Sequence, residues 1–295
     1  MTAISWIFEH VWSALTGLVY VILNPGTVFN FSDGEAVMRF VYYGASVELF
    51  FLFIMTFVGV FITGVFNRDF LWRVVGGLEG FSNTIGRLAA WAGLLMVLQQ
   101  IMVIFLQSIF RVSDIGIGPA GLGFERPLGW WGDGLKFHNA LVVTLCCAYT
   151  FVQGGHVRVD LFYANMRHRT KRAFDMFGAL VFMLPALLIM WHYSWFFMWR
   201  HLINPKVNAT DTLEAMIRKT RAFRWQPETI GFSPNGFDLY FMFKVLIVFF
   251  CVMMLIQAVT FFYRSYLEFV GGPQDAERGL DRDVLDAEPV SEGAN

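Results

Sequence analysis

The sequence predicts an all-α integral membrane protein, with four core transmembrane helices, one extra N-terminal span and amphipathic interfacial helices. Of the 295 residues, 56% are hydrophobic and only 15% are charged, and the mean hydropathy is +0.53. A soluble domain of this size carries more charged residues. The apolar residues also fall in blocks of about 20, the length at which a helix crosses about 30 Å of hydrocarbon. The net charge of −1 argues against a nucleic-acid partner.

The N-terminal segment is predicted to form a helix over residues 4–22 with one narrow polar stripe. The stripe recurs every three or four positions, and Asn24-Pro25-Gly26 ends the helix. Such a helix can lie in the membrane interface, which we favour, or span the bilayer with its stripe against a partner. The stripe consists of Ser5, Glu9, Ser13, Thr16 and Tyr20.

The rest of the chain divides by its apolar blocks. We expect an extra span at 40–66 and a short amphipathic helix at 70–86 lying along the surface. The core spans are expected at 88–110, 135–153, 173–199 and 238–263. A long polar loop, 200–237, carries a helix candidate at Asp211–Phe223. The organisation is therefore 1–39 (helix and outer loop), 40–86 (extra span and amphipathic helix), 87–268 (core) and 269–295 (acidic tail, predicted to be disordered).

Short-loop basic residues set the orientation. Five of them follow the second core span, which places that loop in the cytoplasm: Arg158, Arg167, Arg169, Lys171 and Arg172. The 200–237 loop then lies outside despite its own basic residues, because long outer segments carry less topological weight. Five spans place the N-terminus outside, whereas a spanning 4–22 helix places both ends inside. An aromatic belt is expected at the outer interface, from Trp130, Trp131, Trp191, Trp195 and Trp199.

The loop after the second core span contains His156-Val157-Arg158-Val159-Asp160. From the residues alone this reads as a stop signal with one acid, or as a group that pairs with another element: on a helix His156 and Asp160 share a face, and on an extended segment all three polar side chains do. This five-residue sequence resembles the signature of the small membrane subunit of tripartite ATP-independent periplasmic (TRAP) transporters, the DctQ-like family. Arg87 and Trp91, ahead of a Leu/Met/Val run, are similar to the start of that family's first core span.

This resemblance covers about residues 85–268, and residues 1–84, the enlarged outer loop and the acidic tail look like a longer branch of the family. It implies a small permease subunit without catalytic activity, in the bacterial inner membrane. Its implied partners are a large elevator-type membrane subunit, which carries the substrate and sodium sites, and a periplasmic binding protein that delivers an organic acid. The chain would serve as the fixed scaffold, and its basic outer loop and N-terminal helix would lie near the binding protein.

Polar and small residues inside the first core span have two readings. Gln100 and Gln107 share a helix face, and such groups prefer a hydrogen-bonding partner helix in lipid. The pairs Gly86/Ala90 and Ala89/Gly93 permit close helix approach. Either feature can serve packing within this chain or a face for a larger membrane partner.

Two charged residues lie within predicted spans, Glu48 and Lys244. Each is costly if it faces lipid, so they are expected to pair with each other or with the partner. Neither predicts an ion site, because no cluster of oxygen ligands surrounds broken helices.

Other function classes are less well supported. His138, His192 and His201 raise a haem-binding anchor for a redox enzyme, but facing histidines at matched depth are not indicated. The three cysteines, Cys146, Cys147 and Cys251, form no CxxC and predict no disulfide or metal site. No catalytic grouping and no cofactor is expected. A stand-alone channel or transporter is the remaining alternative, and the low intramembrane charge weighs against it.

Overall fold

The structure is a computed structural model that describes residues 3–27, 29–117, 124–153, 166–230, 236–275 and 278. Within these residues, six helical segments are long and apolar enough to cross a membrane. They are α1 (Ala3–Leu23), α3 (Val47–Phe66), α4 (Arg68–Ser108), α5 (Leu128–Val152), the combined α7 and α8 (His168–Arg200), and α10 (Phe241–Gly271). The all-α membrane fold is therefore confirmed, and α1 qualifies as a span by length and composition.

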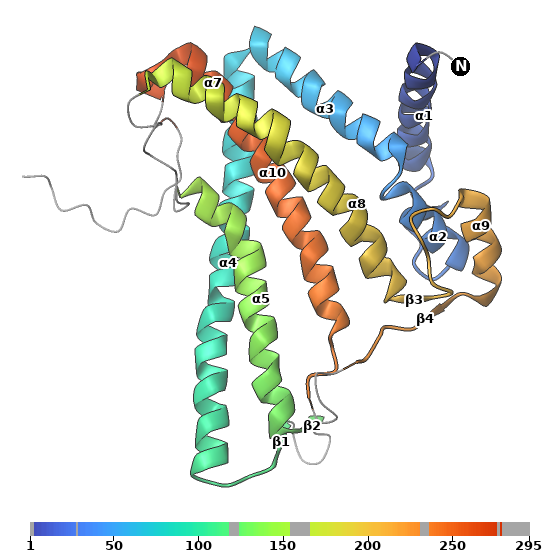
Figure 1. Cartoon of the computed structure of the whole chain (residues 1–295), viewed down its shortest axis with the longest axis vertical. Helices are drawn as coiled ribbons and strands as arrows, with labels where there is room; N and C mark the ends of the chain where they lie inside the picture. The colour runs from blue at the N-terminus through green and yellow to red at the C-terminus, as the bar shows by residue number, and fades with distance from the viewer. Residues whose placement is uncertain are drawn as a thin grey trace, which may run out of the picture.

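Helix α10 lies at the centre of the molecule and packs against α4, α5, α7 and α8 (Figure 1). Its Tyr263 is almost fully buried, and the hydroxyl donates a 2.8 Å hydrogen bond to the carbonyl of Phe57 in α3. Phe262 and Leu267 of α10 pack with Leu71 of α4 in the same apolar cluster. The core thus forms where the C-terminal half of α10 meets α3 and the first half of α4.

The segment predicted as one span at 173–199 contains a local change of helix type. Helix α7 (His168–Gly178) and helix α8 (Leu184–Arg200) are joined by a π-helical turn, Ala179–Met183. Pro185 lies in the first turn of α8 and has no N–H to bond the carbonyl one turn earlier. A π turn accommodates that missing bond without ending the helix.

Helix α4 replaces the two helices expected at 70–86 and 88–110. It begins after Asn67, whose side chain accepts a hydrogen bond from the Phe70 N–H, and runs for 41 residues without interruption. That length is about 60 Å, twice the hydrocarbon thickness. Its charged residues all precede Leu88. The polar first half and the apolar, transmembrane second half therefore form one continuous helix. Packing of the first half against α3 and α10 outweighs the weak helix propensity of its glycines.

The extra span is shorter than expected, because the helix predicted from Phe40 breaks. Helix α2 (Gly34–Tyr43) ends at Gly44, and α3 begins only at Val47. Ser46 caps α3 by accepting a hydrogen bond from the Leu49 N–H. A Cβ on Gly44 would lie 2.1 Å from the indole of Trp195, so only glycine fits at this break.

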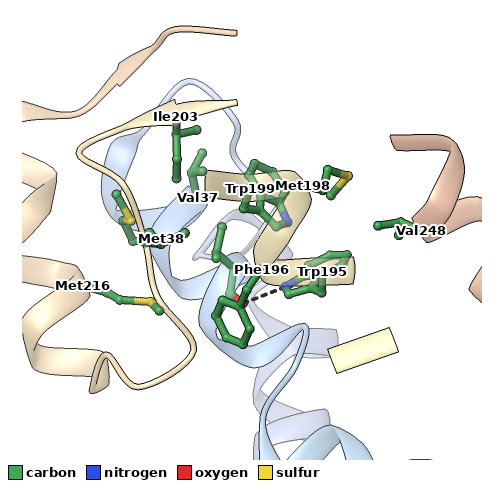
Figure 2. Packing of buried hydrophobic residues seen from close by; sticks show 11 residues of the cluster. Val37, Met38, Trp195, Phe196, Met198, Trp199, Ile203, Met216 and Val248 are labelled. Atoms are coloured by element: carbon green, nitrogen blue, oxygen red, sulfur yellow. Dashed lines mark hydrogen bonds between the residues drawn. The ribbon is translucent and has the colours of Figure 1, made fainter. Parts of the chain in front are cut away.

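Helix α2 belongs to a small unit that we call the outer module. It comprises α2, the end of α8, β3 (Ile203–Asn204), α9 (Leu213–Lys219) and β4 (Arg224–Trp225), with β3 and β4 antiparallel. Helix α9 lies inside the predicted 211–223 segment, and its N-cap is Thr212. Figure 2 shows the side chains that fill the centre of this unit, with Val248 of α10 at its edge: Val37, Met38, Trp195, Phe196, Met198, Trp199, Ile203 and Met216.

The outer module corrects the expected aromatic belt. Trp195 and Trp199 are 6% and 5% exposed and lie inside the protein. The indole N–H of Trp195 donates to the Val41 carbonyl at 2.8 Å (Figure 2), and that of Trp191 donates to the Gly44 carbonyl at 2.9 Å. Trp191 and Trp195 therefore satisfy carbonyls at the end of α2, and Trp199 is buried beside them instead of lining a lipid interface.

Near the start of α10, a hairpin joins α4 to α5. Strands β1 (Asp114–Ile117) and β2 (Phe124–Pro127) are antiparallel. Trp130, just after β2, donates its indole N–H to Asp238 at 2.6 Å and so ties the hairpin to the segment before α10.

Candidate functional site

The residues that carry the family resemblance are distributed unevenly over the structure. His156, Arg158 and Asp160 lie outside the described residues, so their roles stay predictions. Arg87 and Trp91 lie on α4, and Trp91 is 64% exposed. The structure therefore assigns a surface position to the tryptophan.

A buried group of charges joins α4, α7 and α10, and we call it the inner ionic cluster: Glu79, Arg172, Asp175, Arg264 and Glu268. The guanidinium of Arg264 donates to both carboxylate oxygens of Glu79, at 2.6 and 2.7 Å. Arg172 pairs with Glu268 and, at 3.1 Å, with Asp175. Glu79 and Glu268 are only 3% and 2% exposed, so each charge depends on its partner.

Further contacts of Arg264 and Arg278 adjoin this cluster. Arg264 lies over the Trp72 ring at 5.4 Å, and Arg278 lies over the same ring at 5.2 Å. Arg278 is also 3.6 Å from Asp69 at the start of α4. These cation–π and ionic contacts join the end of α10 to the start of α4.

Sequence reasoning missed the inner ionic cluster. Glu79 looked like the polar face of a surface helix, and Arg264 lay just past the predicted end of a span. The two residues are 185 positions apart, and no spacing rule in a single sequence connects them. The one available signal was an acid and a base, each adjacent to an apolar block.

The contact between α4 and α5 uses the small residues that the sequence singled out. A Cβ on Gly86 would lie 2.2 Å from the Cβ of Tyr149, and the Cys146 thiol donates to the Gly86 carbonyl at 3.4 Å. Ala89 is 4% exposed. Gln99, which flanks the predicted pair of glutamines, donates to the Trp131 carbonyl. Gly86 and Ala89 therefore serve packing within this chain, whereas Ala90 is exposed.

The predicted glutamine pair lies elsewhere. Gln100 and Gln107 are exposed on α4. At 100° per residue they lie on a different side of α4 from most of its large exposed apolar residues. Those residues are about half exposed or more: Leu88, Trp91, Leu94, Leu95, Leu98, Ile101, Ile104 and Phe105. The exposed surface of this part of α4, which we call the α4 face, therefore has an apolar side and, away from it, two amides that hydrocarbon cannot satisfy.

The two charged residues expected inside spans do not pair with each other. The ammonium of Lys244 donates to Glu228 of the outer loop at 2.9 Å and is 7% exposed as a residue. That hydrogen bond, with the nearby positive charges, lowers the pKa of Glu228 below its ordinary value of 4.5. Glu48 is instead 3.8 Å from the imidazole of His10 in α1. Lys244, near the start of α10, has an acidic partner because the 200–237 loop folds back over it.

An apolar groove of about 650 Å³ runs between α3, α8 and α10. Its walls are mainly aliphatic and aromatic, with Phe53, Phe57, Leu188 and Val259 among them. Such walls suit hydrocarbon and offer few groups that orient a polar ligand.

No group of three or more His, Cys, Asp or Glu side chains that could hold a metal occurs in the part of the chain that the structure describes. The cysteines Cys146, Cys147 and Cys251 are free thiols. Among these same residues, the ring contacts of His138 and His192 are with neighbours on their own helices, Phe137 for the first and Tyr193 and Phe196 for the second. The histidines raised for a haem site are not brought face to face in these contacts.

The fold and these surfaces define a multi-pass membrane protein in which buried ion pairs join three of the helices. A comparison with known protein families shows which kind of membrane protein it resembles. Residues 122–218 match the family model for the DctQ component of the tripartite ATP-independent periplasmic transporters. This stretch is similar to that family, the small permease component of TRAP transporters, and the match confirms for these residues the resemblance seen in the sequence.

The matched stretch includes the His-Val-Arg-Val-Asp sequence, all of α5, α7 and α8, and most of α9. The family is one of transporter components and not of enzymes. No curated protein and no solved structure shows a significant match to the chain.

Proposed function

We propose that this chain is the fixed scaffold of a sodium-coupled TRAP transporter in the bacterial inner membrane. A large elevator-type subunit carries the substrate and ion sites and moves against it. A periplasmic binding protein delivers an organic acid to the assembly. In this arrangement the long loop 200–237 lies outside, and the basic segment after α5 lies in the cytoplasm.

The inner ionic cluster is the observation that carries this proposal. A scaffold must resist the load of a moving neighbour, and the cluster links three helices through charges that are buried and mutually compensated. Opening this interface would strand charges in a low-dielectric environment, which is costly. A helix bundle joined in this way supports a stationary role better than a rearranging one.

The α4 face is the surface we assign to the large subunit. Leucine and isoleucine are indifferent to whether they meet lipid or protein, but Gln100 and Gln107 gain hydrogen bonds only from protein. Each such bond contributes about 0.6–2 kcal/mol in a membrane. The two glutamines on one helix side therefore favour a protein neighbour over lipid.

The proposal is tested by co-expressing the chain with the large subunit and measuring recovery of the complex. Gln100→Leu with Gln107→Leu should lower the yield of complex while the chain itself stays stable. The matched control is Thr63→Val on α3, another exposed polar group, whose hydroxyl bonds to its own helix at Gly59. Full recovery of complex with the glutamine variant would remove the α4 face as the contact.

A second test addresses the scaffold role itself. The purified chain in liposomes should show no sodium-driven uptake, and uptake should require the large subunit. Transport by the chain alone would overturn the role. Arg158→Ala and Asp160→Ala should lower complex yield or uptake, whereas unchanged assembly and uptake would leave that sequence only a role in setting topology.

A further inference from the structure

The outer module contains a polar pocket separate from the α4 face and from the inner ionic cluster. Its volume is about 380 Å³. We call it the outer pocket. It is lined by Arg200, His201, Ile203, Asn204, Lys206, Gln226, Pro227, Glu228 and Thr229. These residues come from the end of α8, from β3 and from the segment that follows β4.

The backbone around the outer pocket is held in place. Past the paired strands, the Gln226 N–H donates to the Leu202 carbonyl at 3.0 Å, and the Glu228 N–H donates to the His201 carbonyl at 2.9 Å. Lys219, which is paired with Asp211, donates to the Lys206 carbonyl at 3.1 Å. The pocket walls are therefore positioned before any ligand arrives, which reduces the entropy cost of binding.

The charges in the outer pocket do not balance. Glu228 is its one acid, and that carboxylate already accepts from Lys244 at 2.9 Å and lies 3.2 Å from His201 Nε2. Arg200 and Lys206 form no ion pair within the part of the chain that the structure describes. Two cations in one pocket, with the single acid already engaged, leave a net positive potential.

We propose that the outer pocket binds a carboxylate group. Guanidinium and ammonium groups form the strongest hydrogen bonds with such an anion, and the side-chain amides of Asn204 and Gln226 line the same space. The carboxylate comes either from a free organic acid or from an acidic side chain of the periplasmic binding protein. Only the second source rests on the proposed transporter function.

Phenylglyoxal labelling of arginine, resolved residue by residue with peptide mass spectrometry, tests this on the full chain in nanodiscs. One arm adds succinate, with chloride at equal ionic strength as reference. The other adds the purified binding protein without organic acid. Arg218 is the internal control, because it is exposed on α9 near Glu214 and lies outside the outer pocket.

We expect labelling of Arg200 to slow at least about threefold in one arm while labelling of Arg218 is unchanged. Lys206→Gln should abolish that protection. Protection by succinate assigns a small-molecule site, and protection by the binding protein alone assigns a docking contact. Unchanged Arg200 labelling in both arms, or equal slowing at Arg200 and Arg218, would overturn the proposal. The result is separate from the complex-recovery and uptake assays, so each proposal can fail alone.

Discussion

The inner ionic cluster and the outer module both join segments that are far apart in the chain, but they do so by different physical means. The inner cluster uses buried charges from α4, α7 and α10. The outer module uses aromatic and aliphatic packing, with indole N–H groups that satisfy the end of α2. Losing one member of the first strands a charge, whereas losing one member of the second removes contact area or a single hydrogen bond. The inner end should therefore be the less tolerant of substitution.

The outer module also shows how added sequence is accommodated. The N-terminal segment and the enlarged outer loop both looked like additions to a shorter core. In the structure they pack on each other, since α2 contacts α9 and both lie beside the end of α8. One addition thus buries the apolar side of the other, and neither needs a separate core.

The largest expected effect comes from breaking one ion pair of the inner cluster. Glu79→Ala should destabilise the protein by about 3–5 kcal/mol, because it leaves the Arg264 guanidinium without the carboxylate that accepts its two hydrogen bonds. Glu79→Leu combined with Arg264→Met should restore much of the loss, because both charges are then absent. Unfolding midpoints in detergent measure both. A double variant as unstable as the single one would show that packing, and not charge compensation, dominates this interface.

A second effect concerns helix approach near the same end. Gly86→Ala should cost about 1–3 kcal/mol, because its Cβ would overlap Tyr149 and push α5 away. Gly77→Ala lies on the same helix with no atom within 4 Å, and should stabilise by up to about 1 kcal/mol through helix propensity. The opposite signs of the two midpoint shifts are the result to look for. Equal shifts would mean that helix propensity alone governs both positions.

The outer module should respond more weakly. Trp195→Phe keeps an aromatic ring but removes the N–H that bonds the Val41 carbonyl, and should cost about 1 kcal/mol. Trp6→Phe on α1, where the tryptophan is 43% exposed, serves as the control and should have little effect. A loss at Trp195 as large as that from Glu79→Ala would reverse the ranking of the two regions.

The lengths of the apolar blocks predicted most of the membrane-spanning helices. It located α5, α8, α10 and the second half of α4, because a span needs a fixed number of apolar residues whatever surrounds it. It extended the span before α4 too far back, although Gly44 and the capping Ser46 were readable signals. The partners of Lys244 and Arg264 were beyond reach, because they depend on how a loop folds back and which helices touch. Of the small-residue pairs, Gly86 and Ala89 lie on a tight interface within the chain, but a single sequence left open which helix they meet.

The smallest expected effect is a pH dependence of stability from the Glu228–Lys244 pair near the start of α10. The hydrogen bond from Lys244 lowers the pKa of Glu228 in the folded protein below its ordinary 4.5. The stabilisation is therefore fully present above that ordinary value and is lost as the pH falls through the lowered one. For a partly exposed pair it amounts to about 1 kcal/mol or less. Unfolding midpoints between about pH 6 and 3 should fall less steeply for Glu228→Gln than for the wild type.

Glu214→Gln is the matched control for that experiment. Glu214 lies on α9, is 86% exposed at its side chain and lies 3.6 Å from Arg218. Its replacement should leave the acid slope as in the wild type, because an exposed pair contributes little to stability. If Glu228→Gln and Glu214→Gln gave the same slope, the loop would not be held over Lys244 by charge. The outer end would then depend on packing alone, which would sharpen its contrast with the inner ionic cluster.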